Sequence, residues 1–158
     1  MRKDLILAAT DIIITGIALQ LARAEGSLMG IVYDHIVEPG PNIRIKVGHI
    51  EKHIDWVLCN LEGYLDNQNT PSFLKATRVL LAPGTRVIGF DLSELSYISS
   101  TGVGALSALT LESKQTGRFF FVSGVPDRID KVLKLLGFGD LFVNIADPAQ
   151  HDFSRDLK

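Results

Sequence analysis

Three neighbouring hydroxyl side chains, Ser99, Ser100 and Thr101, are the part of this 158-residue chain best suited to chemistry. They stand directly before Gly102, where an apolar run gives way to helical spacing. The first N–H groups of a helix have no partner inside it and carry partial positive charge, so a hydroxyl or a phosphate is favoured there. Such a serine is ordinarily a helix cap worth about 1 kcal/mol. The alternative is that one of the three accepts a phosphate.

The segments on either side of the hydroxyls are predicted to be a buried strand and a helix. Residues 87–90 form a short apolar run typical of a strand, and the polar side chains within 91–96 supply turn and capping groups. Apolar residues then recur at helical spacing, at Val103, Ala105, Leu106 and Leu109. We therefore expect the hydroxyls at the start of a helix that follows a strand and a polar turn.

Known catalytic arrangements do not match this corner. A nucleophile elbow carries Gly-x-Ser-x-Gly, whereas Ser100 is flanked by Ile98-Ser99 and Thr101-Gly102. The two glycines at 102 and 104 lack the third glycine of a dinucleotide loop and the Gly-Lys-Ser/Thr of a P-loop. The sequence therefore predicts neither an enzyme nor a cofactor.

Cys59 and the two histidines His49 and His53 are also expected to be chemically inert. A spacing of four suits a metal site on a helix, but these histidines lie in a predicted strand and turn, so we expect no metal site. Cys59 lies inside an apolar run and has no second cysteine to pair with, which favours a core residue in a reducing compartment.

The residues around the hydroxyls resemble the signature of STAS domains, the family of bacterial anti-sigma factor antagonists. The signature stands here as Asp91-Leu92-Ser93, followed by Tyr97-Ile98-Ser99-Ser100-Thr101-Gly102-Val103-Gly104. Residues 56–73 are similar to the family's second strand, its Leu-x-Gly-x-Leu-Asp turn and its first helix, and residues 117–147 to its later strand, helix and final short strand. The resemblance covers residues 43–147 and implies an α/β fold with a STAS-like mixed β-sheet and helices packed on it.

The resemblance also implies a phosphorylation switch. In the well-studied members of this family the serine that matches Ser100 is phosphorylated by a partner that is both an anti-sigma factor and a serine protein kinase. The unphosphorylated antagonist binds that partner and releases a sigma factor, phosphorylation breaks the complex, and a PP2C-type phosphatase restores it. Ser100 is thus the expected phosphoacceptor, with Thr101 as second choice. The chain departs from the family at Ser99, where Asp is common.

By the same resemblance, the loop of residues 66–70 and the corner of residues 99–103 lie side by side and bind the partner. The expected partner-binding residues are Asp66, Asn67, Asn69, Thr70, Ser99, Ser100, Thr101, Gly102 and Val103.

The composition describes one soluble globular domain. Hydrophobic residues make up 46% of the chain, charged residues 22%, and the net charge is −2, without the bias of a disordered chain. The Lys and Arg residues are scattered, which argues against nucleic-acid binding. We expect a cytoplasmic protein.

Residues 5–22 are an apolar stretch that the resemblance does not explain. Met1-Arg2-Lys3 precedes them, as in a signal peptide or an anchor, but Asp11 would cost about 2.5–3.5 kcal/mol inside a membrane. We therefore expect an extra N-terminal helix that buries its apolar surface against the domain, a second copy or a partner. Homodimerisation or self-docking is favoured over membrane attachment.

The predicted organisation has three parts: residues 1–40 as the apolar helix and a connector, 41–150 as the STAS domain, and 151–158 as a polar C-terminal tail. The connector is placed at 26–40 because Glu38-Pro39-Gly40-Pro41 reads as a boundary. Inside the domain the patterns predict an opening hairpin (43–47 with 56–61), helices at 72–81 and 126–136, and strands at 86–90 and 119–122.

Two other functions stay open beside that of an anti-sigma factor antagonist. Ser99 and the apolar N-terminal stretch favour a non-phosphorylated STAS scaffold or oligomerisation module. A STAS subunit of a membrane transport system is the third interpretation.

Overall fold

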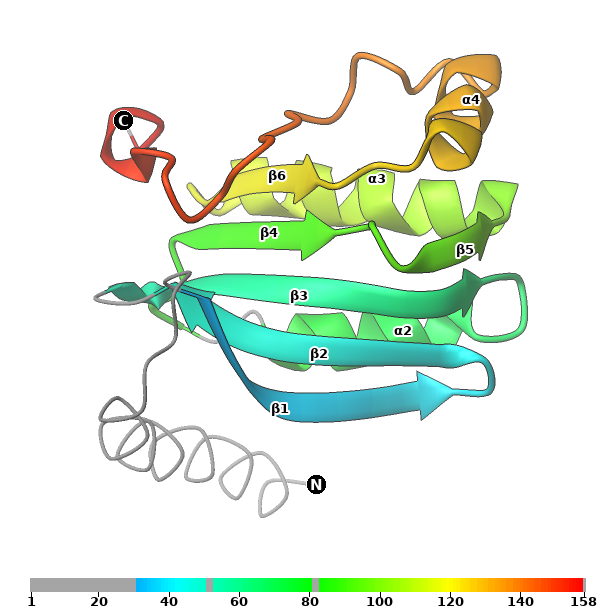
Figure 1. The fold of residues 1–158 in the computed structure, drawn as a ribbon, viewed down its shortest axis with the longest axis horizontal. Helices are drawn as coiled ribbons and strands as arrows, with labels where there is room; N and C mark the ends of the chain where they lie inside the picture. The colour runs from blue at the N-terminus through cyan, green and yellow to red at the C-terminus, as the bar shows by residue number, and fades with distance from the viewer. Residues whose placement is uncertain (1–30, 51–52, 81–82, 158) are drawn as a thin grey trace.

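One mixed sheet, with two helices on one face, organises the domain (Figure 1). The computed structural model describes residues 31–50, 53–80 and 83–157. The predicted N-terminal helix over residues 5–22 lies outside this range. The strands are β1 (Ile31–Gly40), β2 (Ile43–Ile50), β3 (His53–Leu65), β4 (Val87–Asp91), β5 (Leu95–Ile98) and β6 (Phe119–Ser123). The helices are α2 (Thr70–Leu80), α3 (Ser100–Gln115), α4 (Asp127–Leu135) and the short 3₁₀ helix η2 (Phe153–Arg155).

The order of the strands is β1-β2-β3-β4-β6, and β5 pairs with β3. β1, β2 and β3 are antiparallel neighbours, whereas β4, β5 and β6 run parallel to β3 or to each other. β3 is long enough to pair with β4 along residues 56–60 and with β5 along residues 63–65. β5 therefore continues the sheet beyond β4, and its end lies beside the end of β3.

The main core lies between the sheet and the helices. On β2 the side chains alternate, with Ile43, Ile45 and Val47 buried toward α2 and α3. β4 and β6 are buried on both faces, which explains their unbroken apolar runs. The predicted mixed sheet with packed helices is confirmed.

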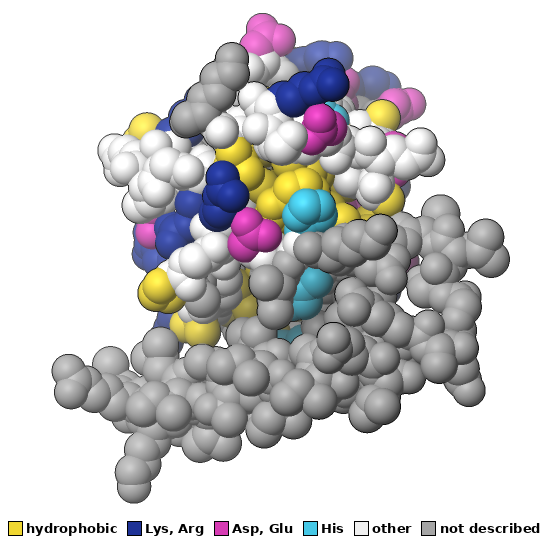
Figure 2. Space-filling view, turned by 90° about the vertical axis from the view of Figure 1, so that its left-hand side faces the viewer, with side chains coloured by type: hydrophobic (Ala, Val, Ile, Leu, Met, Phe, Trp, Pro, Cys, Tyr) yellow, Lys and Arg dark blue, Asp and Glu magenta, His cyan; other side chains and the backbone are white. Residues whose placement is uncertain are grey.

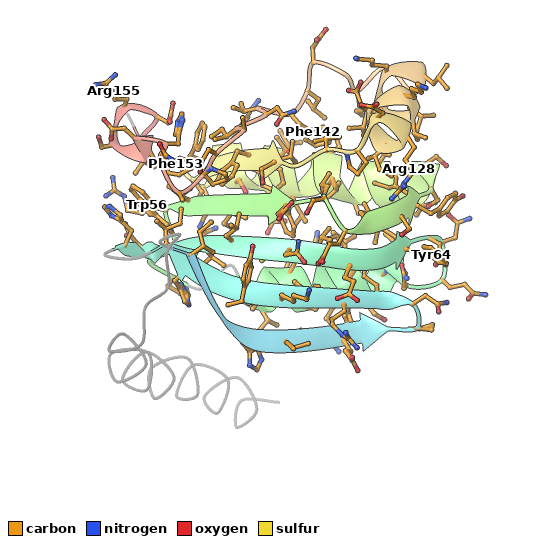
Figure 3. All side chains as sticks on the ribbon, viewed as in Figure 1. Trp56, Tyr64, Arg128, Phe142, Phe153 and Arg155 are labelled. Carbon is orange, nitrogen blue, oxygen red and sulfur yellow. The ribbon has the colours of Figure 1, made fainter. Side chains whose placement is uncertain are left out.

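A second, smaller core covers part of the opposite face of the sheet. Trp56 and Phe121 project to this face, and Phe153 of η2 packs against both, with ring centroids 4.9 Å apart in each case. Figure 3 shows Trp56 and Phe153 at the same end of the molecule. In Figure 2, which looks at that end, hydrophobic side chains occupy the middle of the face with a histidine beside them.

Two predictions of organisation are wrong. Residues 31–40, expected to be a connector, form β1 and pair with β2. Irregularities in the pairing at Tyr33/His35 and at Val37/Gly40 interrupt the two-residue alternation by which a strand is recognised. Residues 151–158, expected to be a polar tail, contain the fully buried Phe153, because one aromatic anchor is enough to hold a polar segment on the sheet.

The strand β5 was also not predicted, because part of it lies in a stretch that the sequence analysis assigned to a polar turn. The remaining elements agree with the sequence apart from their ends. The opening hairpin, the helices α2 and α4 and the strands β4 and β6 lie where the patterns place them. The expected final short strand is reduced to a single bridge between Val122 and Asn144. Within residues 31–50, 53–80 and 83–157, none of the helices has the length and apolarity needed to cross a bilayer.

Candidate functional site

The three hydroxyls lie at the start of α3, as predicted, but the element directly before them is the strand β5 and not a polar turn. Ser99 is the N-cap of α3, with extended backbone angles and an Oγ that accepts a hydrogen bond from the N–H of Gly102 at 3.1 Å. Its carbonyl accepts from the N–H of Val103 at 2.9 Å. These bonds satisfy groups that the helix itself leaves without partners.

Exposure separates the three hydroxyls into two kinds. Ser99 is 9% exposed, and its oxygen is engaged in the cap. Ser100 and Thr101 occupy the first two positions of α3 and are exposed. The first turn of α3 contains no acidic residue, so no carboxylate there neutralises the positive end of the helix dipole. Ser100 and Thr101 are thus the hydroxyls that a second protein can reach, in a place that favours a phosphate.

The loop of residues 66–70 lies directly beside this corner. β3 and β5 run parallel with Leu65 opposite Ile98, so both chains leave the sheet at the same edge. The N–H of Ser99 donates to the carbonyl of Leu65 at 2.9 Å. A Cβ on Gly102 would lie 2.8 Å from the same carbonyl oxygen, so only glycine allows α3 to start this close to β3.

Asp66 and Asn69 fix the shape of the loop. One carboxylate oxygen of Asp66 accepts from the N–H groups of Gln68 and Asn69, at 2.8 and 3.0 Å. The amide of Asn69 donates to the carbonyls of Pro41 and Tyr64 and accepts from the N–H of Asp66. Asn69 therefore ties the turn between β1 and β2 to the end of β3, and its 1% exposure reflects this structural role.

The structure brings the two predicted segments together but divides their residues into two groups. Asn67, Ser100 and Thr101 are exposed, and Asp66 is half-buried. The remaining predicted residues are buried and shape the surface from below: Asn69, Thr70, Ser99, Gly102 and Val103. Which of the exposed residues contact a partner stays a prediction.

Two further residues, Tyr64 and Tyr97, are exposed at the same edge and were not among the predicted site residues. Gln68, inside the predicted loop, is exposed as well. The two tyrosines precede Leu65 and Ile98, the buried residues that end β3 and β5. Because neighbouring residues of a strand face opposite sides, two aromatic side chains at these positions were a usable signal.

Cys59 and His53 behave as core and packing groups. Burial raises the pKa of the Cys59 thiol to about 12, so the thiolate needed of a nucleophile is scarce at neutral pH. The ring of His53 stacks on Trp56, with centroids 3.5 Å apart. In the part of the chain that the structure describes, no group of three or more His, Cys, Asp or Glu side chains is arranged to hold a metal ion.

Replacing the cap is expected to weaken the corner measurably. Ser99→Ala removes the acceptor for the Gly102 N–H and should lower the free energy of unfolding by about 1 kcal/mol. Ser99→Asp keeps an acceptor at the same position and should retain full stability. Urea unfolding checks both, with Ser107→Ala in the middle of α3 as the control, and equal effects of the two alanine substitutions would contradict the capping role.

Comparison with known proteins gives a consistent family. A family model described as the STAS domain matches residues 46–151. A protein named anti-sigma-B factor antagonist, from Staphylococcus aureus strain NCTC 8325 / PS 47, is 30% identical over 79 residues, which are 50% of this chain and 73% of the relative.

Two solved structures share the fold. An anti-sigma factor antagonist from Mycobacterium paratuberculosis superposes with a TM-score of 0.58 at 22% identity, covering 75% of this chain and 97% of its own. The anti-sigma factor antagonist SpoIIAA in its unphosphorylated form gives a TM-score of 0.57 at 17% identity, covering 72% of this chain and 98% of its own.

Proposed function

This chain belongs to the STAS domain family, and from that premise we propose that it is an anti-sigma factor antagonist, which binds an anti-sigma factor and so releases a sigma factor. The names of its relatives support this proposal. The observation that carries it is the exposed Ser100 at the first position of α3, next to the ordered loop of residues 66–70. The corresponding place of action is the cytoplasm.

In the proposed mechanism Ser100 is the regulated hydroxyl. Its partner is an anti-sigma factor that is also a serine protein kinase, and a PP2C-type phosphatase returns the hydroxyl to its free form. A phosphoserine carries about −1.5 to −2 charges at pH 7. On a surface that docks as a neutral hydroxyl, this hydrated group opposes binding through desolvation and like-charge repulsion.

The switch does not require the domain to unfold. A phosphate at the first position of α3 meets the positive end of the helix dipole and N–H groups without acidic neighbours in the first turn. The buried residues beneath it, Ser99, Gly102 and Val103, hold the corner with either form of Ser100. The change is therefore one of surface charge at a fixed geometry.

Ser99 can stabilise the corner of residues 99–103 without the aspartate that is common at this position in the family. A serine oxygen caps α3 where family members commonly carry a carboxylate, so the backbone needs no acid there. What the chain loses is a negative charge beside the phosphoacceptor. We propose that kinase recognition rests on the exposed residues Asn67, Ser100 and Thr101 and on the half-buried Asp66.

The proposed function is tested by reconstitution with the purified anti-sigma factor. We expect a stable complex that dissociates when ATP is added, as phosphate is transferred to Ser100. Ser100→Ala should form the same complex and resist dissociation by ATP. A complex of the wild-type protein that is equally insensitive to ATP would exclude the kinase mechanism, and the absence of any complex would exclude the antagonist function.

A second candidate, a non-phosphorylated scaffold, is favoured by the departure at Ser99. In that case the chain would assemble with copies of itself, for which the apolar residues 5–22 are the proposed contact. Sedimentation of the full chain and of a chain lacking residues 1–25 distinguishes the two, because only a scaffold requires the oligomer for its role.

A further inference from the structure

A polar groove opens beside the proposed docking surface, on the face of the sheet opposite α2 and α3. It has a volume of about 620 Å³ and lies between the turn that joins β1 to β2, the end of β3 and the start of β5. Glu38, Arg44, Glu62, Tyr64 and Glu94 contribute to its walls. Of these five residues only Tyr64 also contacts the loop described above, through its backbone carbonyl, which accepts a hydrogen bond from Asn69.

The backbone at the base of the groove depends on one glycine. Gly63 has a φ of 103°, and a Cβ there would lie 2.1 Å from the carbonyl oxygen of Asn42. The same carbonyl accepts a hydrogen bond from the N–H of Tyr64 at 2.7 Å. This irregularity in β3 holds the turn close to the strand and fixes the walls relative to each other.

A chain of ion pairs runs along the groove and carries an excess of negative charge. Arg44 bridges Glu38 and Glu62, with Nε and Nη1 at 3.1 and 3.6 Å from the carboxylate oxygens. Lys46 bridges Glu62 and Glu94, with Nζ at 3.3 and 2.9 Å. Three carboxylates thus share two bases, which leaves a formal charge of −1.

The carboxylates keep capacity to accept further hydrogen bonds. The contacts to Arg44 and Lys46 engage one oxygen of each, namely Oε1 of Glu38, Oε2 of Glu62 and Oε2 of Glu94. A carboxylate offers two oxygens and about four lone pairs. Hydrogen bonding to Glu94 raises the pKa of Lys46, a sign of the negative potential at this end of the network.

Tyr64, in the wall of the groove, contacts Tyr97 of the neighbouring strand β5. Tyr64 and Tyr97 are 47% and 52% exposed, and their rings meet edge to face with centroids 6.4 Å apart. Tyr64 lies at the same end of the sheet as Arg128 (Figure 3), which donates to the carbonyl of Leu95 and so fastens β5 to α4. Tyr64 and Tyr97 therefore lie on two paired strands, β3 and β5, and not in a loop.

From this geometry we infer that the groove receives an arginine side chain of the partner protein. A guanidinium matches the carboxylates through its planar fork and stacks on an aromatic ring, which an ammonium does less well. Tyr and Arg are also the residues most enriched at energetically dominant positions of interfaces. The inference rests on the proposed function, because it makes the groove a specificity pocket of the same docking face.

The test is a titration of the ¹⁵N-labelled full chain with a short peptide, acetyl-Gly-Arg-Gly-Arg-Gly-amide, followed by NMR. We expect saturable shifts of the amides of Gly63, Tyr64 and Ser96, and weaker binding of the matched lysine peptide. The double substitution Glu62→Gln and Glu94→Gln should weaken arginine-peptide binding about fivefold. These changes are nearly isosteric, and the dispersion of the spectrum reports whether the variant folds.

Glu112→Gln provides the matched control, since Glu112 is 39% exposed against 40% for Glu62 and also pairs with an arginine, Arg78, but lies on α3. Shifts scattered over the surface, or equal weakening by the control, would overturn the inference. The titration involves no anti-sigma factor, so a negative result would exclude arginine binding in the groove and leave the proposed antagonist function untouched. If the antagonist proposal is wrong, the chain would instead bind the arginine peptide but form no complex with the anti-sigma factor.

Discussion

Ser100→Asp is expected to weaken binding to the anti-sigma factor by about 100-fold while leaving the fold intact. A fixed charge at the docking surface costs several kcal/mol when it must be desolvated or meets a like charge, and each 1.4 kcal/mol is tenfold in affinity. Stability should be unchanged or slightly raised, because an acidic residue in the first turn of α3 interacts favourably with the helix dipole. Isothermal titration and thermal unfolding of the same samples measure the two effects.

Ala108→Asp is the matched control for this substitution. Ala108 is exposed on α3, eight residues after Ser100 and thus about 12 Å along the helix. The added charge is the same, but it lies away from the corner, so binding should change little. Equal losses for both variants would mean that overall charge governs the interaction, and full binding by Ser100→Asp would contradict a switch at this position.

Phe153→Ala is expected to produce the largest loss of stability, about 3–5 kcal/mol, as for other fully buried aromatic residues. Phe153 has no exposed surface and contacts three rings of the sheet: its centroid lies 4.9 Å from Trp56, 4.9 Å from Phe121 and 6.0 Å from Phe119. Its removal would leave a cavity and uncover the smaller core. Urea unfolding followed by Trp56 fluorescence measures the loss.

Arg155→Ala controls for a general effect of changes in the C-terminal segment. Arg155 belongs to the same short helix, but its side chain is 85% exposed and pairs only with the nearby Asp152 among its described ion pairs. Such a surface substitution should change stability by no more than about 0.5 kcal/mol. A Phe153→Ala variant as stable as Arg155→Ala would show that the segment is not part of the core.

The centre of the fold could be predicted because its signals are local. The apolar run of β4 is buried on both faces, and the three hydroxyls lie at the start of α3, although only the structure identifies Ser99 as the cap. The close approach of Gly102 to the carbonyl of Leu65 was not predicted and is a finding of the structure. The side-by-side placement of residues 66–70 and 99–103 came from the family resemblance, not from these patterns.

The parts of the fold that were not predicted depend on tertiary contacts, which short sequence patterns do not reveal. β1 pairs irregularly, so its alternation is broken, and β5 is only four residues long. Phe153 is a single aromatic residue in a polar segment. Asn69 and Thr70 were expected to contact the partner, but their side chains donate hydrogen bonds to backbone carbonyls of β3 and of the loop. The burial of a polar side chain cannot be predicted from the sequence until its hydrogen-bond partners are known.

The central claim, that Ser100 is the regulated hydroxyl, is tested most directly by peptide mass spectrometry of the protein isolated from its own cells, grown with and without stress. The account predicts phosphate on Ser100 in a fraction that changes with the growth condition. Absence of phosphate from Ser99, Ser100 and Thr101 under every condition would contradict it and favour the scaffold.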